Sequence, residues 1–107
     1  MDSVVQILEP EGILDGTKTA KFHRQIEQLI ESGVHFILVD FSNVTFMDSS
    51  GLGALVKALK TMNAAGVKLF LCSINEQIKM LFELTSMDSY FSICENREEF
   101  TKQLQQN

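Results

Sequence analysis

The segment Asp48-Ser49-Ser50-Gly51-Leu52-Gly53 places a carboxylate, two hydroxyls and two glycines within six positions. It separates an apolar run typical of a strand from a periodic apolar run typical of a helix, so both hydroxyls are expected at a helix N-terminus. The unpaired N–H groups and the dipole of such a terminus favour a phosphate. The glycines leave the hydroxyls uncrowded. The pattern therefore predicts a serine that is phosphorylated and recognised by another protein.

Two simpler interpretations of these serines remain open. A plain helix cap explains one polar residue, but it does not explain Gly51 and Gly53, because glycine in a first helical turn costs about 0.5–1 kcal/mol relative to alanine. A serine hydrolase needs a glycine two residues before its nucleophile, and those positions hold Met47 and Asp48. A hydrolase also needs a base. The histidines of the chain, His23 and His35, have no evident route to Ser50 in the sequence.

Phosphate-binding loops and metal sites are less well matched. Gly51 and Gly53 lack the third glycine of a dinucleotide loop, and no P-loop lysine follows them. Asp15, Asp40 and Asp48 offer three carboxylates for Mg²⁺ near one end of a sheet, as in a phosphoacceptor aspartate protein. Such a site requires an acidic pair after the first strand, where this chain has Leu8-Glu9-Pro10. We therefore expect Asp15 and Asp48 to act as caps and as polar contacts for a partner, with no metal and no cofactor.

Composition and charge narrow the class of protein. The chain has 107 residues, of which 45% are hydrophobic and 21% charged, so the sequence predicts one folded domain over residues 1–107. A net charge of −5, with Arg24 and Arg97 as the only arginines, argues against general nucleic-acid binding. Cys72 and Cys94 each fall in an apolar run, where a reduced thiol behaves as a small buried hydrophobe.

The beginning of the chain carries no targeting signal that we can identify. Met1-Asp2-Ser3-Val4 is acidic rather than basic, and no apolar run approaches the length of a membrane span. The expectation is a cytoplasmic protein without membrane insertion.

Hydrophobic periodicity predicts an α/β fold. Strands are expected at residues 4–8, 13–14, 36–39, 67–72 and 90–94, with helices between or after the later ones. The turn at residues 9–12 favours antiparallel pairing of the first two strands, whereas strands joined through helices should run parallel with right-handed crossovers. The prediction is a mixed sheet of about five strands with about four packed helices. Asp15-Gly16-Thr17, Asn75 and Asn96 are expected to begin helices.

The block Phe46-Met47-Asp48-Ser49-Ser50-Gly51-Leu52-Gly53 resembles the signature of the STAS domain in bacterial anti-sigma factor antagonists. Other segments are similar to that family along nearly the whole chain: Gly12-Ile13-Leu14-Asp15, Ile37-Leu38-Val39-Asp40-Phe41, Val67-Lys68-Leu69 and Leu81-Phe82-Glu83-Leu84-Thr85. Thr85-Ser86-Met87 departs from the Thr-Gly-Leu turn of many relatives. Ile13 stands where a polar residue is often found.

The resemblance implies a STAS-like fold and a protein that is a ligand and a kinase substrate rather than an enzyme. Its unphosphorylated form would bind an anti-sigma factor with serine kinase activity and free the sigma factor. Phosphorylation of Ser50 would end that binding, and a serine phosphatase would restore it. The implied partner-binding residues are Asp15, Met47, Asp48, Ser49, Ser50, Gly51, Leu52 and Gly53. The alternative is a STAS module without a switch, acting as a scaffold or a transporter-associated subunit.

Overall fold

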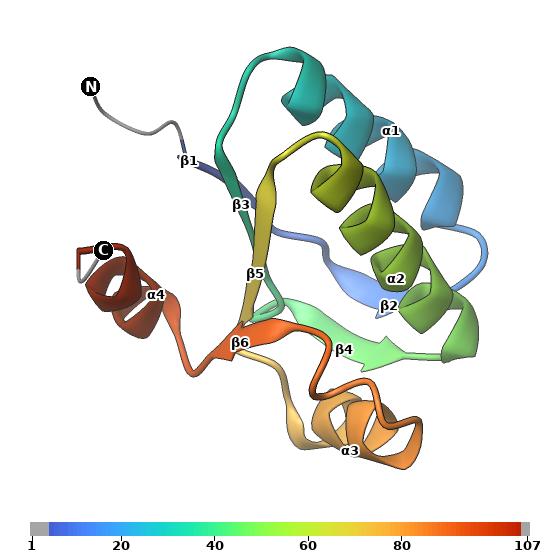
Figure 1. Ribbon diagram of the computed structural model, residues 1–107. Coiled ribbons are helices and arrows are strands. Elements are labelled where there is room, and N and C mark those ends of the chain that lie inside the picture. The colour runs from blue at the N-terminus through green and yellow to red at the C-terminus, as the bar shows by residue number, and fades with distance from the viewer. Residues whose placement is uncertain (1–4, 106–107) are drawn as a thin grey trace.

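The computed structural model describes residues 5–105, in which short strands alternate with helices (Figure 1). The strands are β1 (Val5–Leu8), β2 (Gly12–Leu14), β3 (Phe36–Asp40), β4 (Val44–Met47), β5 (Lys68–Cys72) and β6 (Ser92–Cys94). The helices are α1 (Thr19–Glu31), α2 (Ser49–Ala64), α3 (Glu76–Leu84) and α4 (Arg97–Gln105). The predicted α/β class and the predicted helices are confirmed. Val4, predicted to begin the first strand, lies outside the described residues.

The main sheet has four parallel strands in the order β1-β3-β5-β6. Alternate residues of a strand face opposite sides of a sheet. Ile37 and Val39 of β3 accordingly pack with α1 and α2, while Leu38 packs with Phe100 of α4. Figure 1 shows α1 and α2 together on one face and α4 on the other. This double covering explains why residues 36–39 form a continuous apolar run.

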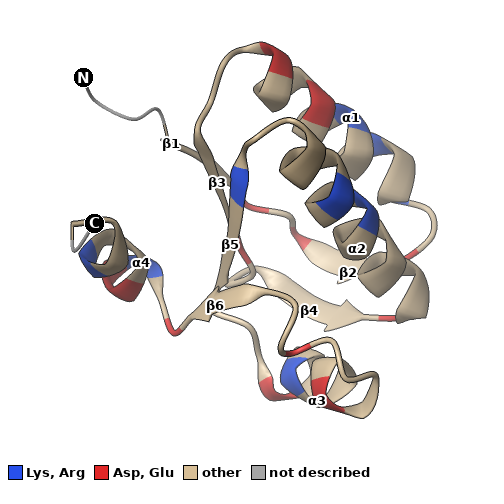
Figure 2. Ribbon diagram, viewed as in Figure 1, with Lys and Arg blue, Asp and Glu red and all other residues tan. Residues whose placement is uncertain are grey.

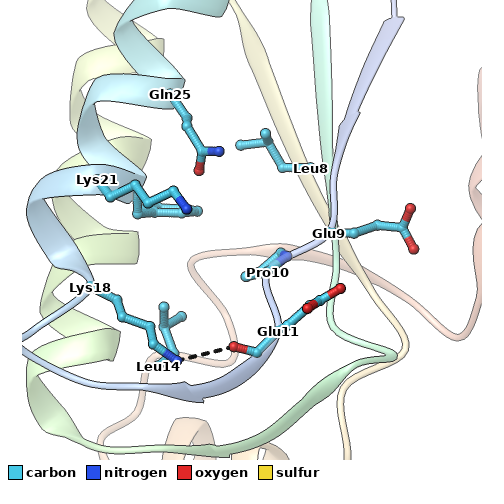
Figure 3. A pocket seen from close by; sticks show the side chains of 9 residues that line it. Leu8, Glu9, Pro10, Glu11, Leu14, Lys18, Lys21 and Gln25 are labelled. Carbon is cyan, nitrogen blue, oxygen red and sulfur yellow. Dashed lines mark hydrogen bonds between the residues drawn. The ribbon is translucent and has the colours of Figure 1, made fainter.

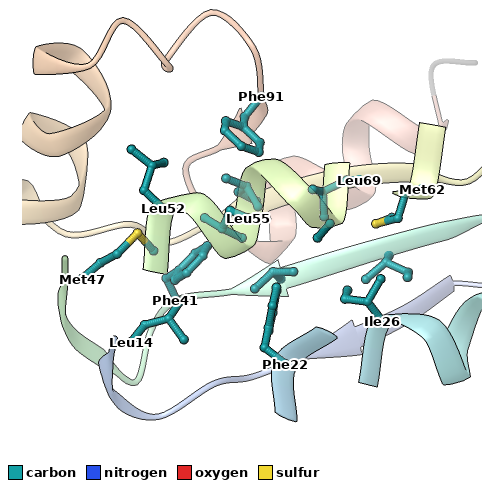
Figure 4. Close-up of a cluster of buried hydrophobic side chains, with 14 of the residues drawn as sticks. Leu14, Phe22, Ile26, Phe41, Met47, Leu52, Leu55, Met62, Leu69 and Phe91 are labelled. Atoms are coloured by element: carbon teal, nitrogen blue, oxygen red, sulfur yellow. The ribbon is translucent and has the colours of Figure 1, made fainter. Parts of the chain in front are cut away.

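The larger core lies between the sheet and the pair α1 and α2. Figure 4 shows its side chains converging from both helices and from the strands. Ile26, Leu55 and Met62 have no exposed surface. Cys72 and Cys94 are register partners on the α4 face, and both thiols are free and buried, as predicted. Burial raises the pKa of both thiols.

The prediction that the first two strands pair antiparallel is wrong. β1 pairs parallel with β3, and β2 pairs parallel with β4 in a separate two-stranded sheet. The turn residues bend the chain without reversing it, because Gly12, at φ +74°, donates its N–H to Asn43 O at 2.8 Å. Strand β4 lies outside every strand that the sequence predicts. Its four residues are ordered by pairing with β2, a contact between distant segments that has no local signal.

Side chains of α3 bind the outer edge of β4. Gln77 Oε1 accepts the Met47 N–H at 2.9 Å, and Gln77 Nε2 donates to Met47 O at 2.8 Å, so one amide replaces a missing neighbouring strand. Asn75 donates to Val44 O and also accepts the Ile78 N–H, which confirms the predicted cap of α3. These bonds satisfy an otherwise open edge and hold the strand that leads into Asp48.

Helix α4 is attached to the sheet by a buried carboxylate. Asp40, 4% exposed, accepts hydrogen bonds from Arg97 Nε at 2.6 Å and from Ser42, and Arg97 Nη2 lies 2.8 Å from Glu9 Oε2. Burial raises the pKa of Asp40, but the bonds from Ser42 and Arg97 outweigh it and leave the pKa below its ordinary value. The predicted cap by Asn96 is also present, since its Oδ1 accepts the Glu99 N–H at 2.9 Å.

Replacing Arg97 by Met should lower the free energy of unfolding by about 1–3 kcal/mol, because a buried carboxylate loses a charged partner. Since the folded pKa of Asp40 is depressed, its contribution is present above about pH 4 and is lost as pH falls through the folded pKa. Urea denaturation at pH 7 and at pH 3 measures both effects. Asp40→Asn should flatten this acid dependence relative to wild type, and an unchanged slope would contradict the assignment.

The turn after α3 keeps a left-handed residue without glycine. Ser86 has φ +58°, and it lies between the bonds Ser86 N–H to Glu83 O and Met87 N–H to Phe82 O. These two bonds form a Schellman motif, in which glycine is usual at the position of Ser86. α2 ends with the same pair of bonds around Gly66, at φ +74°. The departure at Thr85-Ser86-Met87 therefore changes the residue and leaves the turn intact.

Ser86→Gly should raise the free energy of unfolding by about 0.5–1 kcal/mol, because glycine adopts positive φ without a Cβ penalty and loses only part of this gain to unfolded-state entropy. Gly66→Ser is the reciprocal control and should destabilise by a similar amount. Thermal and urea unfolding give both values. Equal stability of Ser86→Gly and wild type would show that Ser86 carries no strain.

Candidate functional site

The start of α2 presents two free hydroxyls. Asp48 is the N-cap, and its carboxylate accepts the Gly51 N–H at 3.0 Å. Ser49 and Ser50 follow as the first two helical residues, and both are exposed. Neither hydroxyl has a hydrogen-bond partner among residues 5–105, so both are available to another molecule. The cap interpretation thus accounts for Asp48 and leaves the serines without a structural role.

The two glycines of the segment have opposite roles. A Cβ added at Gly51 would lie 2.3 Å from Leu14 O and 2.9 Å from Met47 Cγ. A Cβ added at Gly53 would meet no atom within 4 Å. Gly51 therefore allows α2 to pack against the end of β2, whereas Gly53 leaves an open, exposed surface one turn beyond the serines.

The turn after β2 lies against Ser50. Asp15 accepts hydrogen bonds from the N–H and the hydroxyl of Thr17, and these bonds, that from the hydroxyl first, lower the pKa of Asp15. Next to Asp15, a Cβ at Gly16 would lie 3.7 Å from Ser50 Oγ. The predicted cap of α1 at Asp15-Gly16-Thr17 is wrong in detail, because Lys18 is the N-cap and makes no side-chain cap bond. Asp15 instead shapes the turn that borders Ser50.

A groove of 640 Å³ runs from Ser50 between α1 and α2. Small residues line it near Ser50, and Arg24, Lys57 and His23 line it further along; the full lining is Gly16, Thr19, Ala20, His23, Arg24, Ser50, Gly53, Ala54 and Lys57. No carboxylate belongs to this lining. Figure 2 shows Lys and Arg positions on both helices. The groove therefore offers a positive surface beside the hydroxyl.

An apolar pair lies on the two-stranded sheet that leads into the site. Ile13 of β2 and Phe46 of β4 are register partners, and they are 48% and 45% exposed. Asp15 lies two residues after Ile13, and Asp48 lies two residues after Phe46. The surface near the serines thus combines exposed apolar, acidic and hydroxyl groups, a composition suited to protein contact.

His23 lines the groove at Ser50, but within residues 5–105 the groups that hydrolysis or metal binding would use neither pair with Ser50 nor form a cluster. His23 Nε2 lies 3.3 Å from Glu27 Oε2, and no hydrogen bond joins His23 to Ser50 in the part of the chain that is described. Asp15, Asp40 and Asp48 each bind different groups. From residue 5 to residue 105, no cluster of three potential metal-ligating side chains is present.

The predicted partner-binding set divides into exposed and buried residues. Asp15 and Asp48 are half-buried, and Ser49, Ser50 and Gly53 are exposed. Met47, Gly51 and Leu52 are buried and position the segment from below, and contact of the whole set with a partner stays a prediction.

The sequence analysis did not assign Arg24, Lys57 or Gln77 to the site, although Arg24 and Lys57 line the groove and Gln77 binds Met47. The spacing of Ser50, Ala54 and Lys57 along one helical face was a usable signal for the lysine. The pairing of α1 with α2, which brings in Arg24, had no local signal.

The chain belongs to the STAS domain family, whose model matches residues 2–100. This agrees with the four-helix α/β fold and with the placement of the serines at the start of α2.

Named relatives lie within this family. The chain is 30% identical over 87 residues to an anti-sigma-B factor antagonist of Staphylococcus epidermidis, covering 81% of each protein. A crystal structure described as a candidate anti-sigma factor antagonist from Thermotoga maritima is 26% identical with a TM-score of 0.84, covering 92% of this chain and 86% of that one. The unphosphorylated anti-sigma factor antagonist SpoIIAA shares the fold at 19% identity and a TM-score of 0.79, covering 100% and 94%.

The helices of residues 5–105 include none with the length and apolar character needed to cross a membrane.

Gly51→Ala should lower the free energy of unfolding by about 1–3 kcal/mol, because its Cβ would collide with the Leu14 carbonyl. Gly53→Ala is the matched control at an open position and should raise stability by about 0.5–1 kcal/mol through better helix propensity. Urea denaturation of both variants checks the pair. Similar values for the two variants would refute the close contact at Gly51.

Proposed function

We propose that this protein is an anti-sigma factor antagonist whose unphosphorylated form binds an anti-sigma factor with serine kinase activity and frees the sigma factor. The kinase phosphorylates Ser50 and thereby ends the binding, and a serine phosphatase restores it. The chain acts as ligand and substrate and performs no catalysis. It works in the cytoplasm as a single STAS domain over residues 1–107, without a cofactor.

The observation that carries this proposal is the free, exposed hydroxyl of Ser50 at the start of α2. A kinase requires a hydroxyl that can reach its bound nucleotide, and Gly53 beside Ser50 leaves room for a partner's backbone. The named relatives, which are called anti-sigma factor antagonists, support an anti-sigma factor as the partner. The exposed pair Ile13 and Phe46 supplies apolar contact area next to the hydroxyl, and apolar groups of this kind dominate the centre of many interfaces.

The charge of the added group explains how binding would end. A phosphate adds about −1.5 to −2 charges at neutral pH. The N-terminus of α2 tolerates this charge within the free protein. In a complex the same charge would be desolvated next to the carboxylates of Asp15 and Asp48 and next to a nucleotide of the partner. A loss of about 3 kcal/mol of binding free energy would weaken affinity by roughly a hundredfold.

Ser50→Asp should keep the fold and weaken binding to the cognate anti-sigma factor by about a hundredfold, because a charge replaces the free hydroxyl. Ser50→Ala should bind like wild type and resist phosphorylation. Calorimetric titration and kinase assays with phosphosite mapping measure these effects. Incorporation of phosphate into Ser50→Ala at the wild-type rate would show that the phosphorylated residue lies elsewhere.

Ser49→Ala provides the matched control, since Ser49 is the neighbouring exposed hydroxyl and should still allow phosphorylation at Ser50. Gly53→Gln tests the contact surface separately. It should keep the fold, with stability equal to or somewhat above wild type because glutamine favours a helix more than glycine does, and it should reduce partner binding, because the added side chain occupies the open surface beside Ser50. Full binding by Gly53→Gln would remove this surface from the interface.

A further inference from the structure

A second cavity, of 330 Å³, lies on the opposite side of α1 from the groove at Ser50. α1 forms one wall and the segment from Leu8 to Leu14 forms the other (Figure 3). Its volume is within the range of sites that hold small molecules. Leu14 and Phe22 give it an apolar floor and are almost fully buried. Nothing in the proposed switch at Ser50 uses this cavity.

Three polar side chains from the start of α1 line this cavity, and each can donate hydrogen bonds. Lys18, Lys21 and Gln25 lie on one face of α1, at spacings of three and four residues. Figure 3 shows Lys21 and Gln25 directed toward the space in front of Leu8. Lys18 donates to Glu11 O at 3.2 Å and lies within electrostatic reach of Asp15. Lys21 forms no ion pair within residues 5–105 and is therefore the available cation.

The two acidic residues at the rim do not neutralise Lys21. The Glu9 carboxylate lies 2.8 Å from Arg97 of α4, which packs on the other face of the sheet. Figure 3 shows the side chain of Glu11 directed away from Lys21. The first turn of α1 contains no acidic residue. Lys21 therefore offers an uncompensated ammonium beside the apolar floor, in a protein whose net charge is −5.

We propose that this cavity binds a small amphipathic anion, a carboxylate or phosphate monoester with a short apolar body. The ammonium of Lys21 and the side-chain amide of Gln25 hold the anionic group, because charge-assisted hydrogen bonds are the strongest available at this rim. The apolar body lies against half-buried Leu8, with Leu14 and Phe22 at the base of the cavity. Leu14, which lines the cavity, directly precedes Asp15 in the chain. The ligand would therefore lie next to the turn that borders Ser50.

Amide chemical-shift titration of the wild-type protein tests this proposal with three probes of equal chain length: octanoate, octyl phosphate and 1-octanol. We expect at least one of the two anions to bind with a Kd on the order of 0.1–1 mM, shifting amides around Leu8, Leu14 and Gln25, and octanol to bind at least fivefold more weakly. A preference between the anions identifies the head group. Equal binding of octanol, or no shifts at this cavity, would overturn the proposal.

Lys21→Gln should weaken binding of the preferred anion about fivefold to tenfold, since a neutral amide replaces the charged donor. Lys60→Gln, at an exposed position of α2 outside the cavity, is the matched control and should bind within twofold of wild type. Gln25→Phe should fill the cavity and abolish binding. All three positions are exposed, so the variants should fold. Equal weakening by Lys60→Gln would indicate general charge attraction and refute the site.

Discussion

The close packing of Gly51 against the Leu14 carbonyl holds the candidate site together. The same carbonyl accepts the Asp48 N–H at 3.4 Å, so the end of β2 and the start of α2 meet at one backbone group. Any side chain at position 51 would separate them. Because Asp15 and Gly16 follow Leu14 directly, this contact also sets the turn beside Ser50. The hydroxyl is thus positioned by backbone groups rather than by hydrogen bonds of its own.

The surroundings of the serines are held by hydrogen bonds and core packing, although the serines are exposed. Gln77 closes the edge of β4 just before the segment, and Met47 and Leu52 anchor it in the core on both sides. The Asp48 carboxylate caps α2 by accepting the Gly51 N–H. This division leaves Ser49 and Ser50 as the groups without internal partners. A phosphorylation site on such a frame can change charge without needing a change of fold, which suits a switch that acts by preventing contact.

Charge is distributed unevenly over α1. Lys18 is its N-cap, its N-terminal half carries Lys21 and Arg24, and its C-terminal half carries Glu27 and Glu31. This is the reverse of the order that the helix dipole favours. Figure 2 shows this separation along the helix. Arg24 lines the groove at Ser50 and Lys21 lines the cavity on the other side. The arrangement costs some helix stability and concentrates positive charge where anionic groups of other molecules can approach.

The α/β class, the four helices and the placement of Asp48-Ser49-Ser50 at a helix start were determined by the sequence itself, because caps, periodicity and glycine placement are local properties. The caps at Asp48, Asn75 and Asn96 follow from the same local rules. The partners of β1, β2 and β4 were decided only by the tertiary structure, since hydrogen bonds between Gly12 and Asn43 or between Gln77 and Met47 join segments about thirty residues apart. The tertiary structure also separated buried Met47, Gly51 and Leu52 from exposed Ser50 and Gly53. Burial depends on which elements pack together, so adjacent residues of one motif can differ, one facing the core and the next facing solvent.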